Sequence, residues 1–120
     1  MGNVKDLKVY EMSFRFAMEI FFITRKFPLS ERFGLTSQIV RSSRSVCSNI
    51  AEGYRKRKYP QHFISKLTDS DMENTETQVW IQFALQCGYI SSEVASDLES
   101  KADQIGRLLS YMINNSQKFL

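Results

Sequence analysis

Helix-breaking residues are scarce in this chain, and their positions divide it into four long segments. The 120 residues include only two prolines and five glycines, too few for the many turns of an all-β domain of this size. Pro28, Pro60 and Gly88 stand at widely spaced points. The segments between them favour an all-α fold, an antiparallel up-and-down four-helix bundle with short connections, and we expect residues 1–120 to form one domain.

Apolar residues recur at three- and four-residue spacings in each segment. This periodicity predicts helices over about residues 8–26, 31–57, 60–87 and from 92 onward. Ser30 and Ser91 are the expected N-caps of the second and fourth helices. Pro60 suits the first position of the third helix, and Gly88 suits the position just after its end. Residues 114–117 are expected to fray.

The first segment is apolar around most of its circumference. At about 100° per residue, four charged residues fall within about 40° of Arg15 and form one narrow polar stripe with it: Lys8, Glu11, Glu19 and Lys26. Apolar side chains fill roughly 200° of the remainder, whereas a surface helix of a monomer usually has an apolar stripe of little more than 100°. The excess is expected to be buried against a partner subunit, which predicts a homo-oligomer. The alternative is a central helix in an irregular monomer.

A basic run follows the second segment. It consists of Arg55, Lys56, Arg57 and Lys58. Glu52 is the only acid nearby, so these cations cannot all pair locally. They are either a solvated helix end stabilised by the helix dipole or a compact patch for phosphates. Tyr54 and Tyr59 flank the run, and their rings are candidates for stacking on unpaired bases.

Two further arginines lie in the second segment. Antiparallel pairing of the second and third helices about residues 58–59 places Arg41 opposite Glu76 and Arg44 opposite Glu73. Such exposed pairs contribute less than about 1 kcal/mol each. The two arginines are therefore either partners of these acids or secondary contacts for a nucleic acid.

Motifs that carry catalysis or bind cofactors are missing from the sequence. His62 is the single histidine, and no CxxC, phosphate-binding glycine loop, GxSxG or Glu-x-x-His element occurs. A catalytic Ser-His-Asp arrangement would have to use His62, which is expected to be a surface residue. We therefore predict no enzyme, no cofactor and no metal site.

Several features indicate a cytoplasmic protein with no membrane role. The first residues do not resemble a signal peptide. The most apolar stretch, residues 14–23, is short and contains Arg15 and Glu19, so it is not expected to span a membrane. Cys47 and Cys87 are expected to be reduced. The net charge of +3 permits an anionic partner without requiring one.

Several short elements resemble a known family. They are Asp6-Leu7-Lys8-Val9, Arg32-Phe33-Gly34-Leu35-Thr36-Ser37-Gln38-Ile39, Ser48-Asn49-Ile50-Ala51-Glu52-Gly53 and Gly88-Tyr89-Ile90-Ser91. Together they resemble the proteins associated with intervening sequences in bacterial 23S ribosomal RNA, over nearly the whole chain. The resemblance implies a four-helix bundle assembled as a ring, typically a pentamer, without enzymatic activity. The related accessory variability protein of diversity-generating retroelements is a basic pentamer that works with a reverse transcriptase and nucleic acid.

Two hypotheses about function follow. The first is a non-enzymatic, ring-forming bundle that binds structured nucleic acid such as RNA. Its candidate contacts are Arg55, Lys56, Arg57 and Lys58, with Arg41 and Arg44 second. The alternative is an oligomeric protein-interaction scaffold with no nucleic-acid role, whose protein partner is unknown. Charge reversal within residues 55–58 should impair only the first.

Overall fold

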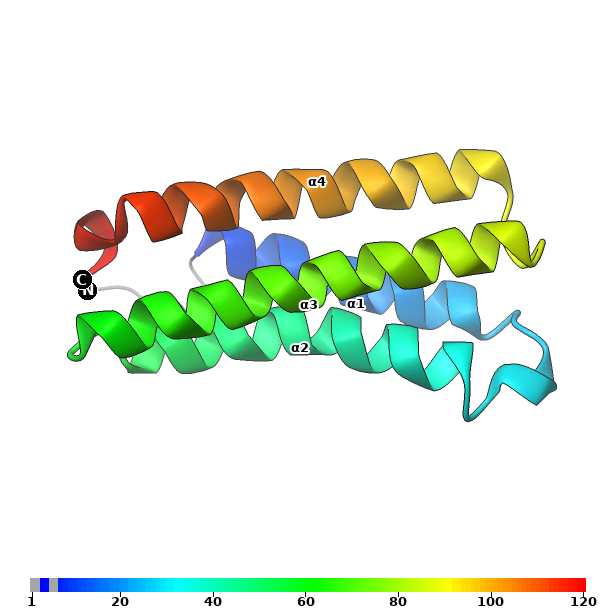
Figure 1. Cartoon of the computed structure of the whole chain (residues 1–120), viewed down its shortest axis with the longest axis horizontal. Coiled ribbons are helices and arrows are strands. Elements are labelled where there is room, and N and C mark those ends of the chain that lie inside the picture. Colours follow the sequence, from blue (N-terminus) through cyan, green and yellow to red (C-terminus); the bar gives the residue numbers. More distant parts are fainter. Residues whose placement is uncertain (1–2, 5–6) are drawn as a thin grey trace.

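The computed structural model describes residues 3–4 and 7–120 of the chain. Four long helices account for most of this part (Figure 1): α1 (Lys8–Thr24), α2 (Leu35–Arg55), α3 (Pro60–Gln86) and α4 (Ser92–Asn114). Two short 3-10 helices, η2 (Leu29–Glu31) and η3 (Ser116–Phe119), precede α2 and follow α4. Asp6, in the first of the family-like elements, lies outside the described residues.

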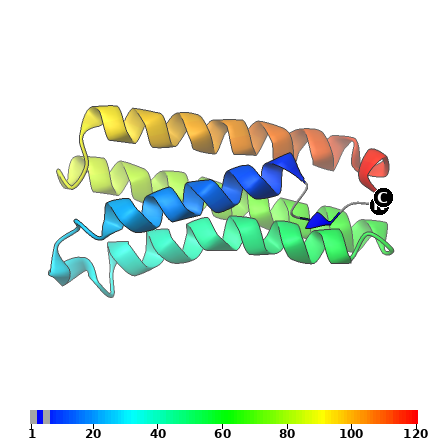
Figure 2. The same ribbon diagram turned by 180° about the vertical axis from the view of Figure 1, so that it is seen from behind.

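Each helix packs beside its neighbours in the chain, and α4 returns to pack beside α1. The arrangement confirms the predicted all-α, up-and-down four-helix bundle. α3 is at the front in Figure 1 and α1 is at the front when the molecule is seen from behind in Figure 2. α1 and α3 therefore run in the same direction on opposite sides of the bundle. None of the described helices is long and apolar enough to cross a membrane.

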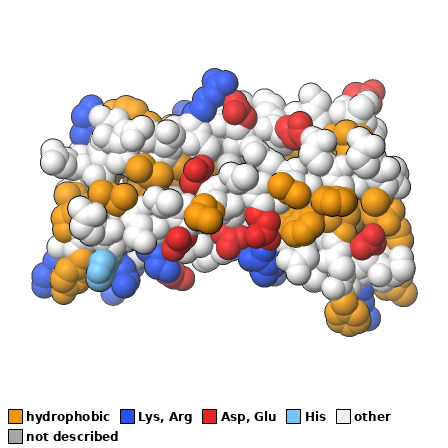
Figure 3. All heavy atoms as spheres, viewed as in Figure 1, with side chains coloured by type: hydrophobic (Ala, Val, Ile, Leu, Met, Phe, Trp, Pro, Cys, Tyr) orange, Lys and Arg blue, Asp and Glu red, His pale blue; other side chains and the backbone are white. Residues whose placement is uncertain are grey.

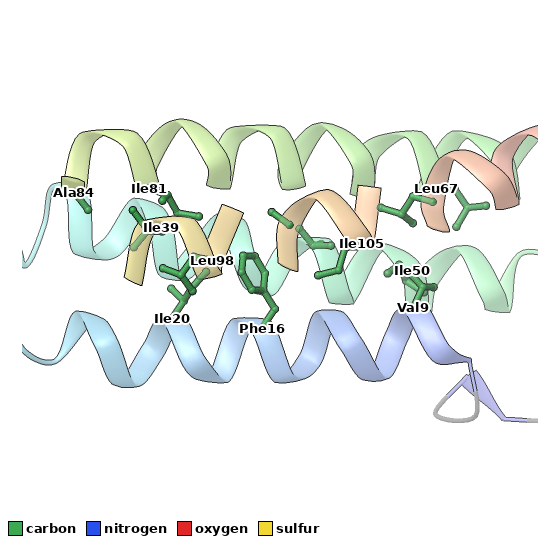
Figure 4. Close-up of a cluster of buried hydrophobic side chains, with 14 of the residues drawn as sticks. Val9, Phe16, Ile20, Ile39, Ile50, Leu67, Ile81, Ala84, Leu98 and Ile105 are labelled. Carbon is green, nitrogen blue, oxygen red and sulfur yellow. The ribbon is translucent and has the colours of Figure 1, made fainter. Parts of the chain in front are cut away.

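Apolar side chains from all four helices meet along the bundle axis (Figure 4). Phe16 and Ile20 of α1 face Leu98 and Ile105 of α4, and all four are at most 2% exposed. Burying side chains of this size stabilises the fold by roughly 1.5–3 kcal/mol each. The three- and four-residue spacing of these residues in the sequence is what turns one face of each helix toward this axis.

The middle of α3 places polar side chains in the core. Ser70, Asn74 and Thr77 are at most 2% exposed. The Ser70 hydroxyl donates to the Val46 carbonyl of α2 at 2.7 Å, and the Asn74 amide donates to the Ala102 carbonyl of α4 at 2.9 Å. Thr77 shares a 2.8 Å hydrogen bond with Ser42 of α2. These bonds satisfy the two hydroxyls and the Asn74 amide N–H, which would otherwise be costly to bury, whereas the Asn74 Oδ1 is buried without a partner among the described residues. The bonds fix how α2 and α4 are aligned with α3.

Gly53 lets α2 and α3 approach closely. A Cβ atom at this position would lie 3.0 Å from the Lys66 Cβ and 3.5 Å from the Phe63 carbonyl oxygen. The glycine therefore admits the neighbouring helix near the end of α2, where any larger residue would push against α3.

Three of the predicted helix ends are confirmed. The Ser91 hydroxyl accepts the Val94 N–H at 3.1 Å and caps α4. Pro60 is the first residue of α3. Gly88 has φ 77°, which favours glycine, and the next residue, Tyr89, donates its N–H to the Ala84 carbonyl. This is the hydrogen bond that closes a helix ending in a left-handed glycine.

Two predictions about ends are wrong. α2 begins at Leu35 rather than near residue 31, and Ser30 does not cap it. The Glu31 carboxylate accepts the Leu35 N–H at 3.0 Å instead, because η2 and a turn at Gly34 intervene. The tail does not fray either, since η3 packs onto α3 and α4 and the Phe119 ring lies edge-on to Tyr111.

Candidate nucleic-acid interface

The turn between α2 and α3 presents cations to solvent at one end of the bundle. α2 ends at Arg55, and the Tyr59 N–H donates to the Lys56 carbonyl at 2.8 Å, which makes the connection tight. The side chains of Arg55, Lys56 and Lys58 are exposed. In Figure 3, Lys and Arg side chains gather around the single histidine at this end. Arg55, Lys56 and Lys58 form the basic turn.

Arg57 belongs to the same run but is held against the protein. Its guanidinium carbon lies 3.6 Å from the centre of the Tyr54 ring. Its Nε donates to the Tyr54 carbonyl at 2.9 Å, and its Nη1 donates to the Phe119 carbonyl at 3.5 Å. Arg57 therefore fastens η3 to the end of α2, and it is only half-exposed.

The basic turn makes no ion pair with the described part of the chain. Within the part of the chain that the structure describes, no carboxylate lies at ion-pair distance from Arg55, Lys56 or Lys58. Glu52, the acid closest in sequence, pairs with Lys66 at 2.8 Å. The hydrogen bond to Glu52 raises the pKa of Lys66 above its ordinary value. The local acid is thus already engaged by another cation.

Only one of the two flanking tyrosines is accessible. Tyr59 is 56% exposed, and its ring centre lies 5.7 Å from that of His62. The expectation that Tyr54 can stack on a base is wrong, because its ring is buried and Arg57 covers one face. A hollow of about 400 Å³ beside the basic turn is lined by Asn3, Val4, Tyr54, Arg55 and Arg57.

Arg41 and Arg44 behave differently from each other. Arg41 forms ion pairs with Glu73 at 3.2 Å and with Glu76, which confirms the predicted Arg41–Glu76 pair. The predicted Arg44–Glu73 pair is wrong. Arg44 points toward α1, where its guanidinium carbon lies 5.6 Å from the Phe21 ring centre. Glu73 forms its ion pair with Arg41 instead.

The structure does not bring the two groups of arginines into one patch. Arg44 and Arg55 are eleven residues apart on α2, which separates them by about 16 Å along the helix. A nucleic acid would have to lie along α2 to reach both. The basic turn is therefore the compact candidate site, and Arg41 and Arg44 lie on the side of the bundle.

The remaining reactive side chains are dispersed. No group of three or more His, Cys, Asp and Glu side chains that could hold a metal occurs among residues 3–4 and 7–120. Cys47 and Cys87 are both free thiols, the first buried and the second exposed. Burial raises the pKa of the Cys47 thiol, which disfavours the reactive thiolate.

A sequence model of the 23S rRNA-intervening sequence proteins matches residues 5–111. The chain belongs to this family. It is also similar to a crystal structure of a protein of unknown function from the S23 ribosomal protein family of Bacteroides thetaiotaomicron. That chain is 27% identical, with a TM-score of 0.77, and the match covers 88% of this chain and 97% of the other. Among curated proteins, none matches the chain.

In this member of the 23S rRNA-intervening sequence family, the family-like elements serve packing and capping. Ile50 is fully buried, Gly53 admits α3 and Glu52 pairs with Lys66. Glu31, just before the Arg32–Ile39 element, holds the start of α2. These elements therefore explain the fold, whereas the basic turn lies just beyond the Ser48–Gly53 element.

Reasoning from the sequence missed two features. The anchoring of Arg57 depends on Phe119, which is far away in the chain, and no local pattern indicates it. The outer face of α3 exposes Met72, Val79 and Phe83, by 65%, 45% and 54%. Their seven- and four-residue spacing places them on one face, opposite the buried Ser70 and Thr77, and a helical wheel of this segment would have found them.

Proposed function

We propose that this family member is a non-enzymatic bundle that binds structured nucleic acid through the basic turn while assembled as a ring of identical copies. The observation that supports the proposal is a set of three cations, Arg55, Lys56 and Lys58, which are exposed at a tight turn beside the exposed ring of Tyr59. None of the three has a carboxylate at ion-pair distance among the described residues.

The chemistry of the basic turn suits phosphates more than bases. Three exposed cations on one short segment can each neutralise a phosphate and release a counterion, which makes binding sensitive to salt. Contacts of this kind position a nucleic acid without reading its sequence. Tyr59 adds one aromatic surface on which an unpaired base can stack. The proposal therefore favours a folded RNA with loops over a uniform duplex.

Assembly strengthens such weak contacts. Three large apolar side chains of α1 are exposed to solvent: Phe14 by 51%, Met18 by 37% and Phe22 by 55%. The apolar surface of α1 that the bundle core does not cover therefore faces outward. Covering it with another copy would repeat the basic turn around a ring, and repeated contacts gain strength through effective concentration. The family resemblance implies five copies, and we propose a pentamer.

The direct test is the binding of a labelled, structured ribosomal RNA fragment to the protein and to Arg55→Glu/Lys58→Glu. Arg57 is left unchanged because it anchors η3. The matched control is Lys26→Glu/Arg32→Glu, which changes the net charge equally in the connection at the opposite end of the bundle. We expect the basic-turn variant to bind at least tenfold more weakly than the unchanged protein, and the control to be affected much less.

An equal loss of affinity in both variants would show that net charge alone governs binding and would contradict the assigned site. If the protein binds no RNA at low salt while remaining oligomeric, the scaffold hypothesis replaces this proposal. In that case the basic turn is a solvated helix end.

A further inference from the structure

An apolar groove runs between α1 and α2 on one side of the bundle. It has a volume of about 440 Å³, and its lining includes Tyr10, Phe14 and Met18 of α1 and Arg44, Ser48 and Ala51 of α2. The large side chains of α1 form one wall, and the small side chains of α2 leave room beside it. We refer to this surface between α1 and α2 as the groove. Its depth comes from the contrast between these two sets of residues.

An apolar ridge lies on the outer face of α3. Met72, Val79 and Phe83 project from it, and the Trp80 ring centre lies 5.9 Å from that of Phe83. In Figure 3, apolar side chains gather over the part of α3 toward its C-terminal end. This surface is the ridge. α1 and α3 lie on opposite sides of the bundle, so one molecule cannot bring its own ridge into its own groove.

The groove and the ridge lie at similar heights along the bundle. The Cys47 thiol contacts the Tyr10 carbonyl at 3.9 Å, and the Ser70 hydroxyl donates to the Val46 carbonyl. Tyr10 is therefore level with about residue 70. Because α1 and α3 run in the same direction with the same rise per residue, Met18 is level with about residue 78. The ridge spans residues 72–83, so a second copy placed alongside with its axis parallel would present its ridge at the height of the groove.

The two surfaces also carry opposite charge. Several charges of α2 and α3 are paired within one copy, Arg41 with Glu73 and Glu76 and Glu52 with Lys66, whereas Arg44 lines the groove. On the rim of the groove, Arg44 has no carboxylate at ion-pair distance among the described residues. Beside the ridge, Asp69 is exposed and likewise has no cation at that distance within the described part of the chain. Asp69 acts at longer range on Lys66 of its own helix, but Arg44 and Asp69 have opposite charges and neither makes an ion pair with the described part of its own copy.

We propose that the ridge of one copy docks into the groove of the next, with Arg44 facing the acidic flank of α3. This inference rests on the ring assembly proposed above and specifies its interface. The contact is head-to-tail, because each copy uses two different surfaces. Contacts of this type build rings when they close, whereas contact between two identical surfaces stops at a dimer.

The test uses one variant for each surface. Met18→Glu places a charge in the groove, and Phe83→Glu places one on the ridge. Both residues are exposed, at 37% and 54%, so the fold should tolerate the changes. Ser100→Glu adds the same charge at an exposed position of α4, away from both surfaces, and serves as the control. Sedimentation velocity measures the mass of each protein alone and of the two variants mixed.

We expect the unchanged protein and Ser100→Glu to share one oligomeric mass, and each surface variant alone to be a monomer. Mixing the two surface variants should yield a heterodimer and nothing larger, because the intact ridge of Met18→Glu fits the intact groove of Phe83→Glu. If either surface variant keeps the full oligomeric mass, or if the mixture forms no heterodimer, this pairing is overturned. A monomeric unchanged protein would overturn the ring itself. RNA binding by the unchanged protein is measured separately, so failure of the basic turn is distinguished from failure of the interface.

Discussion

Glu31 joins three segments of the chain through its two carboxylate oxygens. One oxygen accepts the Leu35 N–H at 3.0 Å and so caps α2. The other accepts the Tyr89 hydroxyl, from the connection before α4, at 2.9 Å. The bond from Leu35, followed by that from Tyr89, lowers the pKa of Glu31. The same carboxylate raises the pKa of Tyr89 to about 12.

Replacing Glu31 with glutamine should lower the thermal midpoint near neutral pH, because a neutral amide oxygen is a weaker acceptor than a carboxylate. A lowered folded-state pKa means that ionised Glu31 stabilises the fold above the ordinary value of 4.5. This contribution disappears as the pH falls through the folded-state value. Thermal unfolding across a pH series should therefore show the two proteins converging in acid. A difference in thermal midpoint between the two proteins that stays constant down to strongly acidic pH would contradict this account.

Arg57 and Lys56 are adjacent cations with different roles, and alanine substitutions should separate them. Arg57→Ala removes the contact with the Tyr54 ring and the bonds to the Tyr54 and Phe119 carbonyls, at an expected cost of about 1–2 kcal/mol. Lys56→Ala, at an exposed position, should change stability by less than about 0.5 kcal/mol. Urea unfolding measures both changes. Equal effects would show that Arg57 is not an anchor.

At the scale of helices, sequence periodicity was enough to predict which segments pack and in what order. Regular spacing turns one apolar face of a helix inward whatever its partners are. Antiparallel geometry predicted the Arg41–Glu76 pair correctly but also predicted an Arg44–Glu73 pair that does not form, because Arg44 turns toward α1. The start of α2 was not predictable in this way, because Ser30 and Glu31 are both able to cap a helix. The turn at Gly34 places the first N–H of α2 beside the Glu31 carboxylate and not beside Ser30. Of the candidate site, the exposed cations could be predicted, whereas the inward orientation of Arg57 depends on the tail.

Gly53 offers a test of how closely α2 and α3 pack. Valine at this position would force its Cβ against Lys66 and the Phe63 carbonyl, and overpacking of this kind should destabilise the fold by about 2 kcal/mol. Gln38→Val places the same residue at an exposed position of α2 and should cost well under about 1 kcal/mol. Urea unfolding compares them. A tolerated Gly53→Val would mean that the helices can separate there at little cost.

The whole molecule has an uneven distribution of charge. Cations are concentrated on α2 and in the α2–α3 connection, whereas α3 is acidic. Within one copy, Arg41 links the basic helix to the acidic one. The basic turn remains outside this pairing at one end of the 44 Å long bundle. An assembly of parallel copies would gather these ends on one face and present a single basic surface to an anionic partner.

The salt dependence of RNA binding tests the central claim most directly. Affinity for a structured ribosomal RNA fragment is measured over a series of salt concentrations for the protein and for Lys58→Gln. The account predicts that log affinity falls linearly with log salt, and that the variant has a slope shallower by about 0.9 for each phosphate that it no longer neutralises. Undetectable binding at low salt, or identical slopes for the two proteins, would contradict the claim that the basic turn binds nucleic acid.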